Sequence, residues 1–173
     1  PRSLFPHTGY PAEVGDGEGR GHTLNVALPE GVDDGGWVRA LEAVLVPVAR
    51  ELRPSLIVSQ HGADTHHRDP LADLAISVEA QAEAARVIGE AAREYAGGRW
   101  VALGGGGYDV ADVVPRSWTA VAAAVAGVDL DFSLPLPHAW REAAIAVGGA
   151  GVPRVLGDGV NVTWRAFERG HDP

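Results

Sequence analysis

The stretch of this chain that says most about its architecture is Ser55-Leu56-Ile57-Val58-Ser59-Gln60. This short apolar run begins directly after Pro54 and is followed by a polar loop over residues 61–73. Short, bounded apolar runs are typical of strands that are buried on both faces of a parallel sheet. A second run of this kind, Trp100-Val101-Ala102-Leu103, leads into four glycines. We therefore expect two buried parallel strands at these positions.

Helical patterns lie on either side of both runs. From Asp34 onward, apolar residues recur at helical spacing up to Pro54, and Asp33 or Asp34 can cap the first turn. Residues 77–95 and about 112–126 predict two further helices, and residues 25–28 read as another short strand. The resulting order, β-α-β-α-β-α, predicts an α/β fold with crossover helices, as part of a doubly wound parallel sheet.

The pattern weakens beyond residue 127. Pro135 and Pro137 interrupt the chain there, while residues 138–147 favour a helix and residues 160–164 favour one more short strand. The region therefore reads as partly irregular.

Composition and charge exclude several classes of function. The chain has 173 residues, a net charge of −9 and 14 basic residues, all of them arginines that are scattered along its length. Nucleic-acid binding calls for a basic stripe, and none is visible. No apolar run approaches the roughly 20 residues that span a bilayer. Cysteine is absent, which excludes thiolate metal sites and is compatible with a cytoplasmic location.

The loop after the first buried run is rich in potential metal ligands. Asp64, His66, His67 and Asp69 fall within six residues, and the carboxyl end of a parallel strand is where α/β proteins bind ligands. Carboxylate and imidazole donors together suit Zn²⁺ or Fe²⁺. The alternative is a loop in which the aspartates cap turns and the histidines face solvent.

The loop after the second run is Gly104-Gly105-Gly106-Gly107-Tyr108. It lacks the Lys-Ser/Thr of a phosphate-binding P-loop, and four consecutive glycines fit the spaced dinucleotide fingerprint poorly, so no NAD site is expected. Consecutive glycines allow the backbone to approach a substrate closely. The phenol of Tyr108 is suited to donate a hydrogen bond to a developing oxyanion.

Four segments, taken in order, resemble the histone deacetylases of the arginase/deacetylase fold, and most closely the bacterial acetoin-utilisation deacetylases. They cover about residues 4–120 and are specific as an ordered set: Leu4-Phe5-Pro6-His7-Thr8-Gly9, Gln60-His61-Gly62-Ala63-Asp64-Thr65-His66, Leu103-Gly104-Gly105-Gly106-Gly107-Tyr108 and Val114-Pro115-Arg116-Ser117-Trp118-Thr119. On this resemblance, residues 1–126 are the C-terminal part of a deacetylase catalytic domain and residues 127–173 are a C-terminal extension.

The resemblance also implies roles for individual residues. Asp64 is implied to be the third protein ligand of a catalytic Zn²⁺ or Fe²⁺, and Tyr108 to hydrogen-bond the acetyl carbonyl of an acetylated lysine. Gly106, with Gly105 and Gly107, is implied to line the channel for the acyl-lysine. His66 and His67 are implied to lie outside the ligand set, and Asp69 is expected to brace the loop through backbone N–H groups.

By order and context, Asp64-Thr65-His66 and His66-His67 belong to the family's later single-Asp segment, so its Asp-x-His ligand strand and its catalytic His-His pair are missing here. In the family they precede the Phe-Pro segment, and only four residues precede Phe5 here. We therefore expect a chain that is inactive by itself and that needs the N-terminal half of the domain. Two other readings stay open: an amidohydrolase acting on acetylpolyamines or other small amides, and a non-catalytic remnant that binds a partner.

Overall fold

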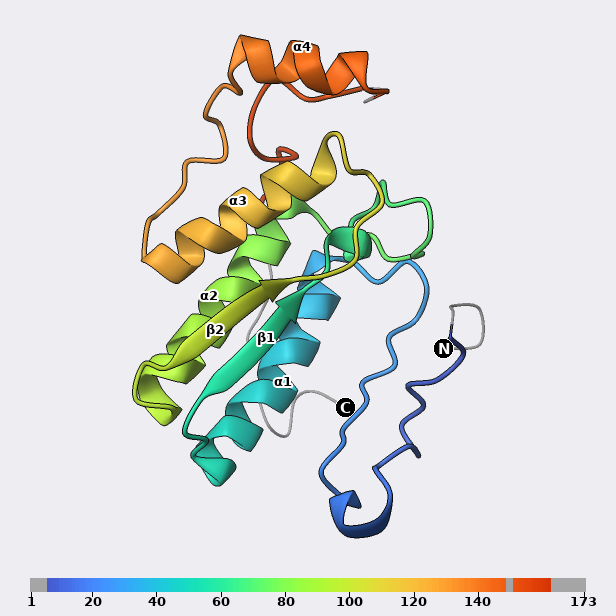
Figure 1. Ribbon diagram of the computed structural model, residues 1–173, viewed down its shortest axis with the longest axis vertical. Helices are drawn as coiled ribbons and strands as arrows, with labels where there is room; N and C mark the ends of the chain where they lie inside the picture. The colour runs from blue at the N-terminus through green and yellow to red at the C-terminus, as the bar shows by residue number, and fades with distance from the viewer. Residues whose placement is uncertain (1–5, 149–150, 163–173) are drawn as a thin grey trace.

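The computed structural model describes residues 6–148 and 151–162 of the chain (Figure 1). Two short 3-10 helices, η1 (Gly17–Gly19) and η2 (Ala63–Thr65), accompany the regular elements. In chain order these are α1 (Asp34–Leu52), β1 (Ile57–His61), α2 (Val78–Tyr95), β2 (Trp100–Gly104), α3 (Val113–Ala126) and α4 (His138–Ala146). The two strands and the helices expected from about residue 34 onward are confirmed to within a few residues.

The sheet consists of β1 and β2, which run parallel with Ile57 opposite Trp100 and His61 opposite Gly104. Helix α2 is the crossover between them, and in Figure 1 the strands lie in front of α1 and α2. On the face toward the helices, Trp100 Nε1 donates to Ser59 Oγ at 2.7 Å. A Cβ at Gly89 of α2 would stand 3.0 Å from the Trp100 ring, so a glycine lets α2 approach the sheet.

The opposite face of the sheet is bare. Val58 is 57% exposed and Leu103 is 51% exposed, whereas their neighbours on the other face are partly covered. The expectation that both strands are buried on both faces is therefore wrong for this chain. The apolar runs have the composition of doubly covered strands, but α1 and α2 lie on one side of the sheet (Figure 1) and Val58 and Leu103 on the other side stay exposed.

The N-terminal ends of α1 and α2 are tied together. Asp33 caps α1 by accepting from Gly36 N at 2.9 Å, and Ser77 caps α2 by accepting from Ala80 N at 3.1 Å. The buried carboxylate of Asp34 in turn accepts from Ser77 N at 2.7 Å and from Ser77 Oγ at 2.6 Å. Close to this junction, Val38, Ile76 and Ala80 form a fully buried apolar cluster.

The strand expected at residues 25–28 does not form. The segment is extended, but it joins no ladder in the described part of the chain, and Leu24 and Val26 are 61% and 48% exposed. Together with apolar residues of α1 such as Val44 it lines a groove of about 360 Å³. An extended segment becomes a strand only where a partner takes up its N–H and C=O groups. The described order is therefore α-β-α-β-α-α.

The chain after α3 folds back on itself. Pro135 bridges to Val155, and Leu156 N donates to Leu134 O at 3.0 Å. The strand expected at residues 160–164 is absent from residues 160–162, and residues 163 and 164 lie outside the described part. Among the helices of the described residues, none has the length and apolar character required to cross a membrane.

Candidate active site

The two candidate loops meet at one edge of the sheet. Because β1 and β2 are parallel, the loops that leave them begin side by side. Ala63 N, at the start of η2, donates to Gly106 O at 2.7 Å and so joins the loop after β1 to the loop after β2. The structure thus brings Asp64 and the glycines before Tyr108 together.

Asp64 is held between two glycines. A Cβ on Gly62 would overlap Asp64 Oδ1, and a Cβ on Gly106 would overlap Asp64 Oδ2 and stand 2.8 Å from its Cγ. Any side chain at either position would displace the carboxylate. The expected role of Gly106 in lining a substrate channel remains a prediction, and the structure supplies a second reason for a glycine there.

The environment of Asp64 disfavours its charged form. Partial burial raises the pKa of this carboxyl, the negative charge of Asp69 raises it further, and only a local backbone hydrogen bond acts against them. A cation bound beside Asp64 would offset both effects. The carboxylate is therefore a chemically suitable ligand for a metal ion.

The remaining glycines of the second loop fit it against β1 and η2. A Cβ on Gly105 would overlap the amide of Gln60. Gly107 has φ +146°, a backbone conformation that favours glycine, and a Cβ there would lie 2.7 Å from Val114 Cγ2 and 3.0 Å from Ala63 Cβ. The sequence predicted that this glycine loop lets the backbone approach a substrate closely. In the structure the backbone of the loop packs closely against other residues of the protein.

Tyr108 is fixed through its backbone and exposed through its side chain. Its N–H donates to Asp69 Oδ2 at 2.9 Å, and 53% of the residue is accessible to solvent. Asp69 Oδ1 also accepts from Leu71 N at 2.9 Å. The expectation that Asp69 braces the loop through backbone N–H groups is confirmed, and the brace extends across to the Tyr108 loop.

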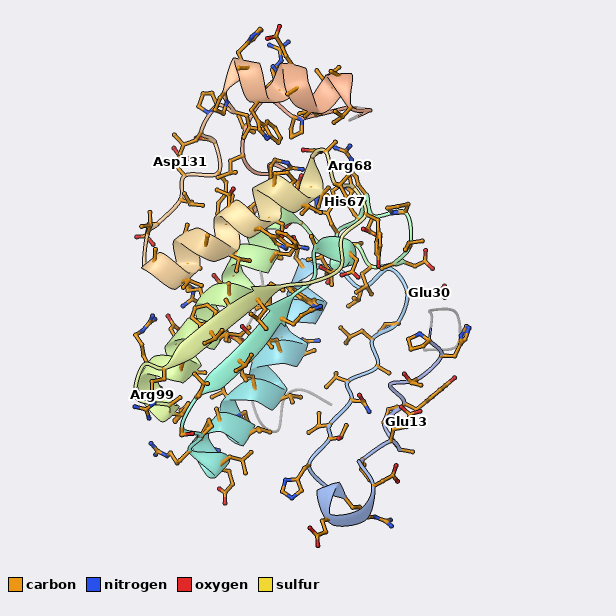
Figure 2. All side chains as sticks on the ribbon, in the orientation of Figure 1. Glu13, Glu30, His67, Arg68, Arg99 and Asp131 are labelled. Carbon is orange, nitrogen blue, oxygen red and sulfur yellow. The ribbon has the colours of Figure 1, made fainter. Side chains whose placement is uncertain are left out.

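His66 has both ring nitrogens occupied. The residue is fully buried, its Nε2 lies 3.0 Å from Asp158 Oδ2, and its Nδ1 accepts from Arg68 N at 3.1 Å. His67 is exposed and its ring lies 4.2 Å from that of His66 (Figure 2). These contacts agree with the implied exclusion of His66 from the ligand set.

Within the described residues, one group of three or more potential metal ligands occurs, and it does not include Asp64. It consists of His66, His67 and Asp158, whose ligand atoms all lie within 4.8 Å of one another. Asp158 also accepts from the buried guanidinium of Arg116 at 3.0 Å. The Arg116 guanidinium already occupies one oxygen of this carboxylate, and both ring nitrogens of His66 have hydrogen-bond partners. The three residues are therefore poorly suited to bind a metal ion.

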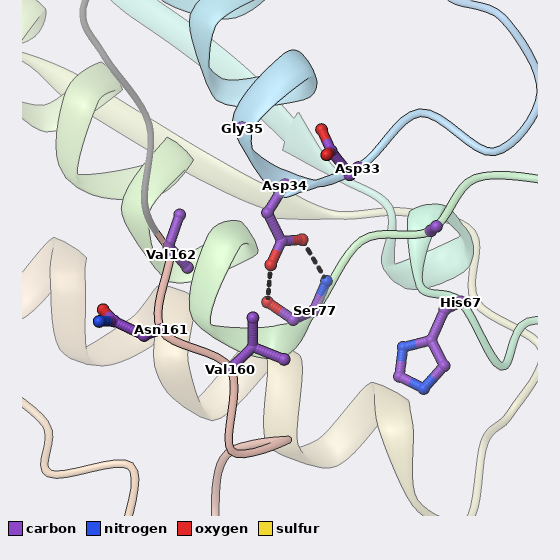
Figure 3. Close-up of a pocket in the computed structure, with 9 residues that line it drawn as sticks. Asp33, Asp34, Gly35, His67, Ser77, Val160, Asn161 and Val162 are labelled. Atoms are coloured by element: carbon purple, nitrogen blue, oxygen red, sulfur yellow. Dashed lines mark hydrogen bonds between the residues drawn. The ribbon is translucent and has the colours of Figure 1, made fainter.

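A pocket separate from the two loops lies beside His67, near the N-terminal ends of α1 and α2 (Figure 3). It has a volume of about 270 Å³ and is lined by Asp33, Asp34, Ser77 and Val160, among others. Both oxygens of Asp34 accept from Ser77, and Asp33 caps α1. These acidic groups therefore serve the ends of the helices.

Sequence reasoning missed the buried charged residues around these loops. Arg116 and Asp112 are 1% and 0% exposed, and Arg116 Nε donates to Asp112 Oδ1 at 2.7 Å. The i, i+4 spacing of this pair on a helix was a usable signal. The sequence around Asp158 contains no such signal, because this residue lies between two glycines and is far along the chain from its partners.

Comparison with known proteins places these features in a family. The histone deacetylase domain matches residues 1–125. The acetoin utilization protein AcuC of Bacillus subtilis is 38% identical over 134 residues, which are 78% of this chain and 35% of the relative. A probable deacetylase of Archaeoglobus fulgidus is 39% identical over 127 residues, or 73% of this chain and 35% of the relative. The chain thus spans about a third of the length of these relatives.

Solved structures give the same result. A crystal structure of an HDAC homolog complexed with SAHA superposes with a TM-score of 0.76 at 28% identity, covering 95% of this chain and 44% of the other. An HDAC homolog from Aquifex aeolicus gives 0.75 at 28% identity with the same coverage. The short parallel sheet with its helices is therefore part of the arginase/deacetylase fold. On the sequence match, the order of the motifs and the superposed fold, the chain belongs to the histone deacetylase family.

Proposed function

We propose that this chain is the C-terminal part of a metal-dependent, NAD-independent protein lysine deacetylase, which hydrolyses N-acetyl-lysine with a metal-activated water. The observation that carries the proposal is the contact between the two loops, in which Ala63 N donates to Gly106 O and Asp64 is enclosed by glycines. The likeness to AcuC proteins supports a link to acetoin or acetate metabolism.

Asp64 is the residue of this chain that would hold the metal, Zn²⁺ or Fe²⁺. When bound, such an ion polarises the amide carbonyl and lowers the pKa of its water toward about 7. Catalytic zinc sites use three protein ligands and keep one position open. No group of three candidate ligands in the described residues contains Asp64, so at least one further ligand would have to come from outside this part of the chain.

Tyr108 would act on the substrate directly. Its phenol can donate a hydrogen bond to the oxygen on which negative charge develops. Asp69 fixes the backbone of Tyr108, while the side chain remains 53% exposed and accessible to a substrate. Gly105, Gly106 and Gly107 would line the path of the acylated lysine, where the absence of side chains leaves room for its alkyl stem.

The bare sheet face supports the need for the rest of the domain. Two parallel strands with an apolar face in water are marginally stable, and Val58, Val101 and Leu103 are all more than two-fifths exposed. The related structures contain more than half their length outside the region that this chain covers. We propose that the missing part covers this face and supplies the remaining ligands, and that the chain alone is inactive.

The test is to express the chain with and without the coding sequence that lies in frame upstream of Pro1. The added upstream segment should contain an Asp-x-His and a His-His motif of its own, and the longer protein should release acetate from an acetyl-lysine peptide without NAD. Chelation should abolish this activity, and Zn²⁺ or Fe²⁺ should restore it. An acetylated diamine, tested in parallel, distinguishes a small-amide amidohydrolase from a protein deacetylase.

Two results would contradict the proposal. Turnover by the 173-residue chain alone would show that the site is complete without further ligands. An upstream segment that lacks both motifs would favour a non-catalytic protein that binds a partner. A longer protein that carries both motifs and hydrolyses neither substrate would favour the same conclusion.

A further inference from the structure

Asp158 closes a ring of buried hydrogen bonds. Its Oδ2 pairs with His66 Nε2 at 3.0 Å, and its Oδ1 accepts from Arg116 Nη1 at 3.0 Å. From His66 the ring continues through Nδ1, which accepts from Arg68 N at 3.1 Å. Arg68 Nη1 donates to Asp112 Oδ2 at 2.6 Å, and Asp112 Oδ1 accepts from Arg116 Nε at 2.7 Å. The ring thus returns to its starting residue.

The charges in the ring are balanced and largely withdrawn from solvent. The side chains of His66, Asp112 and Arg116 are at most 1% exposed, that of Asp158 is 10% exposed, and that of Arg68 is 29% exposed. Two aspartates face two arginines, so each buried charge has an opposite partner, as burial requires. Burial by itself raises the pKa of Asp158. Hydrogen bonds from His66 and Val78 N, together with the Arg116 charge, nevertheless hold that pKa well below its ordinary value.

The ring fixes the tautomer of His66. A backbone N–H can only donate, so Nδ1 of His66 must be unprotonated where it accepts from Arg68 N. The proton of the neutral ring is therefore on Nε2, where it is donated to Asp158. A carboxylate that sets the tautomer and orientation of an imidazole in this way is a recurrent device in enzyme sites.

His66 stands inside the loop that carries the candidate active-site groups. It lies two residues after Asp64 and three before Asp69. Its backbone adds to the loop, because His66 N donates to Ala63 O at 3.2 Å and Asp69 N donates to His66 O at 2.9 Å. Asp69 in turn bonds Tyr108 N. An unbroken series of contacts therefore leads from Asp158 to Tyr108.

The segment that carries Asp158 is anchored independently. The carboxylate of Glu79, in the first turn of α2, accepts from Asp158 N at 3.1 Å, Gly159 N at 2.9 Å and Val160 N at 3.2 Å. Asp158 also accepts from Val78 N at 2.8 Å. These bonds hold the segment on the N-terminal end of α2, and Asp158 therefore reaches His66 from a fixed point.

We propose that Asp158, which lies beyond the family match at residues 1–125, is a positioning residue for the Asp64–Tyr108 site. It holds His66 as the Nε2–H tautomer and thereby sets the path of residues 64–69, from which Asp64 projects and Asp69 fixes Tyr108. The inference rests on the proposed function only in taking Asp64 and Tyr108 as the groups that this loop serves.

The test is nitrogen-15 NMR of the 173-residue chain. In the unsubstituted protein, His66 should show a protonated Nε2 and a bare Nδ1. In Asp158→Asn, either the Arg116 guanidinium or the Val78 N–H must lose its acceptor. Hydrogen bonds from charged donors are the stronger ones, so the carboxamide oxygen should face Arg116 and its NH₂ should face His66 and Val78 N. The proton should then move to Nδ1, Arg68 N–H should lose its acceptor, and the amide signals of Arg68 and Tyr108 should shift. Asp131→Asn, in an exposed turn, is the matched control and should shift neither.

Two outcomes overturn the proposal: a protonated Nδ1 in the unsubstituted chain, or a folded Asp158→Asn variant with unchanged His66 tautomer and Tyr108 amide. If Asp158→Asn does not fold, Asp158→Glu takes its place, and loss of the Nε2–H tautomer in that folded variant counts against the proposal. In the longer protein, Asp158→Asn should lower kcat roughly 10- to 100-fold, as for other residues that orient site groups, with Asp158→Glu partly restoring it. The NMR measurement of the His66 tautomer needs no enzyme turnover. Failure of the deacetylase proposal can therefore be distinguished from failure of the proposal for Asp158.

Discussion

The carboxylate of Asp69 and the backbone N–H of Tyr108 are joined at 2.9 Å across the two loops that leave the sheet. The residues are 39 positions apart in sequence, and the bond leaves the Tyr108 phenol free. The backbone of Tyr108 is thus held by Asp69 of the loop after β1, while the Tyr108 side chain faces solvent. This arrangement suits a group that must be aimed at a substrate and must also remain accessible to it.

Asp69→Ala should destabilise the chain and disturb the second loop. The change leaves the backbone N–H groups of Leu71 and Tyr108 without their acceptor, and losing the partner of such groups costs about 1–3 kcal/mol. Urea unfolding measures the loss. Asp73→Ala, a few residues along the same loop and exposed, is the control. Equal stability of the two variants would contradict the brace.

Gly106→Ala should displace the Asp64 carboxylate. The new methyl group would overlap Asp64 Oδ2 and crowd its Cγ at 2.8 Å, and overpacking of this kind costs about 1–3 kcal/mol. We expect a lower thermal midpoint for the chain and loss of metal-dependent turnover in the longer protein. Gly19→Ala, where a Cβ meets nothing within 4 Å, should change neither. A fully active Gly106→Ala protein would remove Asp64 from the proposed site.

Tyr108→Phe should lower turnover of the longer protein by roughly 10²-fold or more, as for loss of an oxyanion donor. Stability should be unchanged, because the exposed phenol has no structural partner in the fold described above and the backbone bond to Asp69 is retained. The measurements are kcat with an acetyl-lysine peptide and a urea titration. Tyr95→Phe, at the end of α2, is the control. Undiminished kcat in Tyr108→Phe would exclude the phenol from the mechanism.

Acid should destabilise the chain partly through Asp158. The folded-state pKa of this carboxyl is depressed, whereas the unfolded value is about 3.9. Its contribution to stability is therefore complete above about pH 4 and is lost as pH falls below that value toward the native pKa. Urea unfolding of the chain at pH 3 and pH 6 should show a smaller difference for Asp158→Asn than for the unsubstituted protein. The same difference in both would contradict the assignment.

Val58→Glu should reduce self-association of the isolated chain. Val58 lies on the bare sheet face and is 57% exposed, and apolar faces of this kind promote association in water. Sedimentation velocity should show less oligomer, with a helical content equal to that of the unsubstituted chain. Val110→Glu, at a position that is 69% exposed and lies off the sheet, is the control. If both substitutions act alike, the sheet face is not the associating surface.

The features that could be predicted from the sequence are those that depend on residues close together along the chain. The helical spacing between Asp34 and Leu52 and the short apolar runs at Ile57 and Trp100 are local patterns, and each became the expected element. The convergence of Asp64 and Tyr108 followed from a general rule about parallel strands. Both loops do meet, through Ala63 and Gly106.

Features that depend on distant partners were not predictable in the same way. Residues 25–28 have the composition of a strand, but pairing is decided by what lies beside them, and the described part of the chain provides no partner. Val58 has the character of a doubly buried residue and is exposed for the same reason. Asp158 bonds a histidine 92 residues away, a distance over which no periodicity or spacing carries information.

That separation has a consequence for how the protein is made. A ribosome adds about 5–20 residues per second, so several seconds or more pass between the synthesis of His66 and that of Asp158, 92 residues later. Until Asp158 has been added, the guanidinium of Arg116 lacks one of its two carboxylate partners and the His66 ring lacks the carboxylate that faces its Nε2. On the proposed role of Asp158, nascent chains that end before this residue carry a His66 loop without its carboxylate partner.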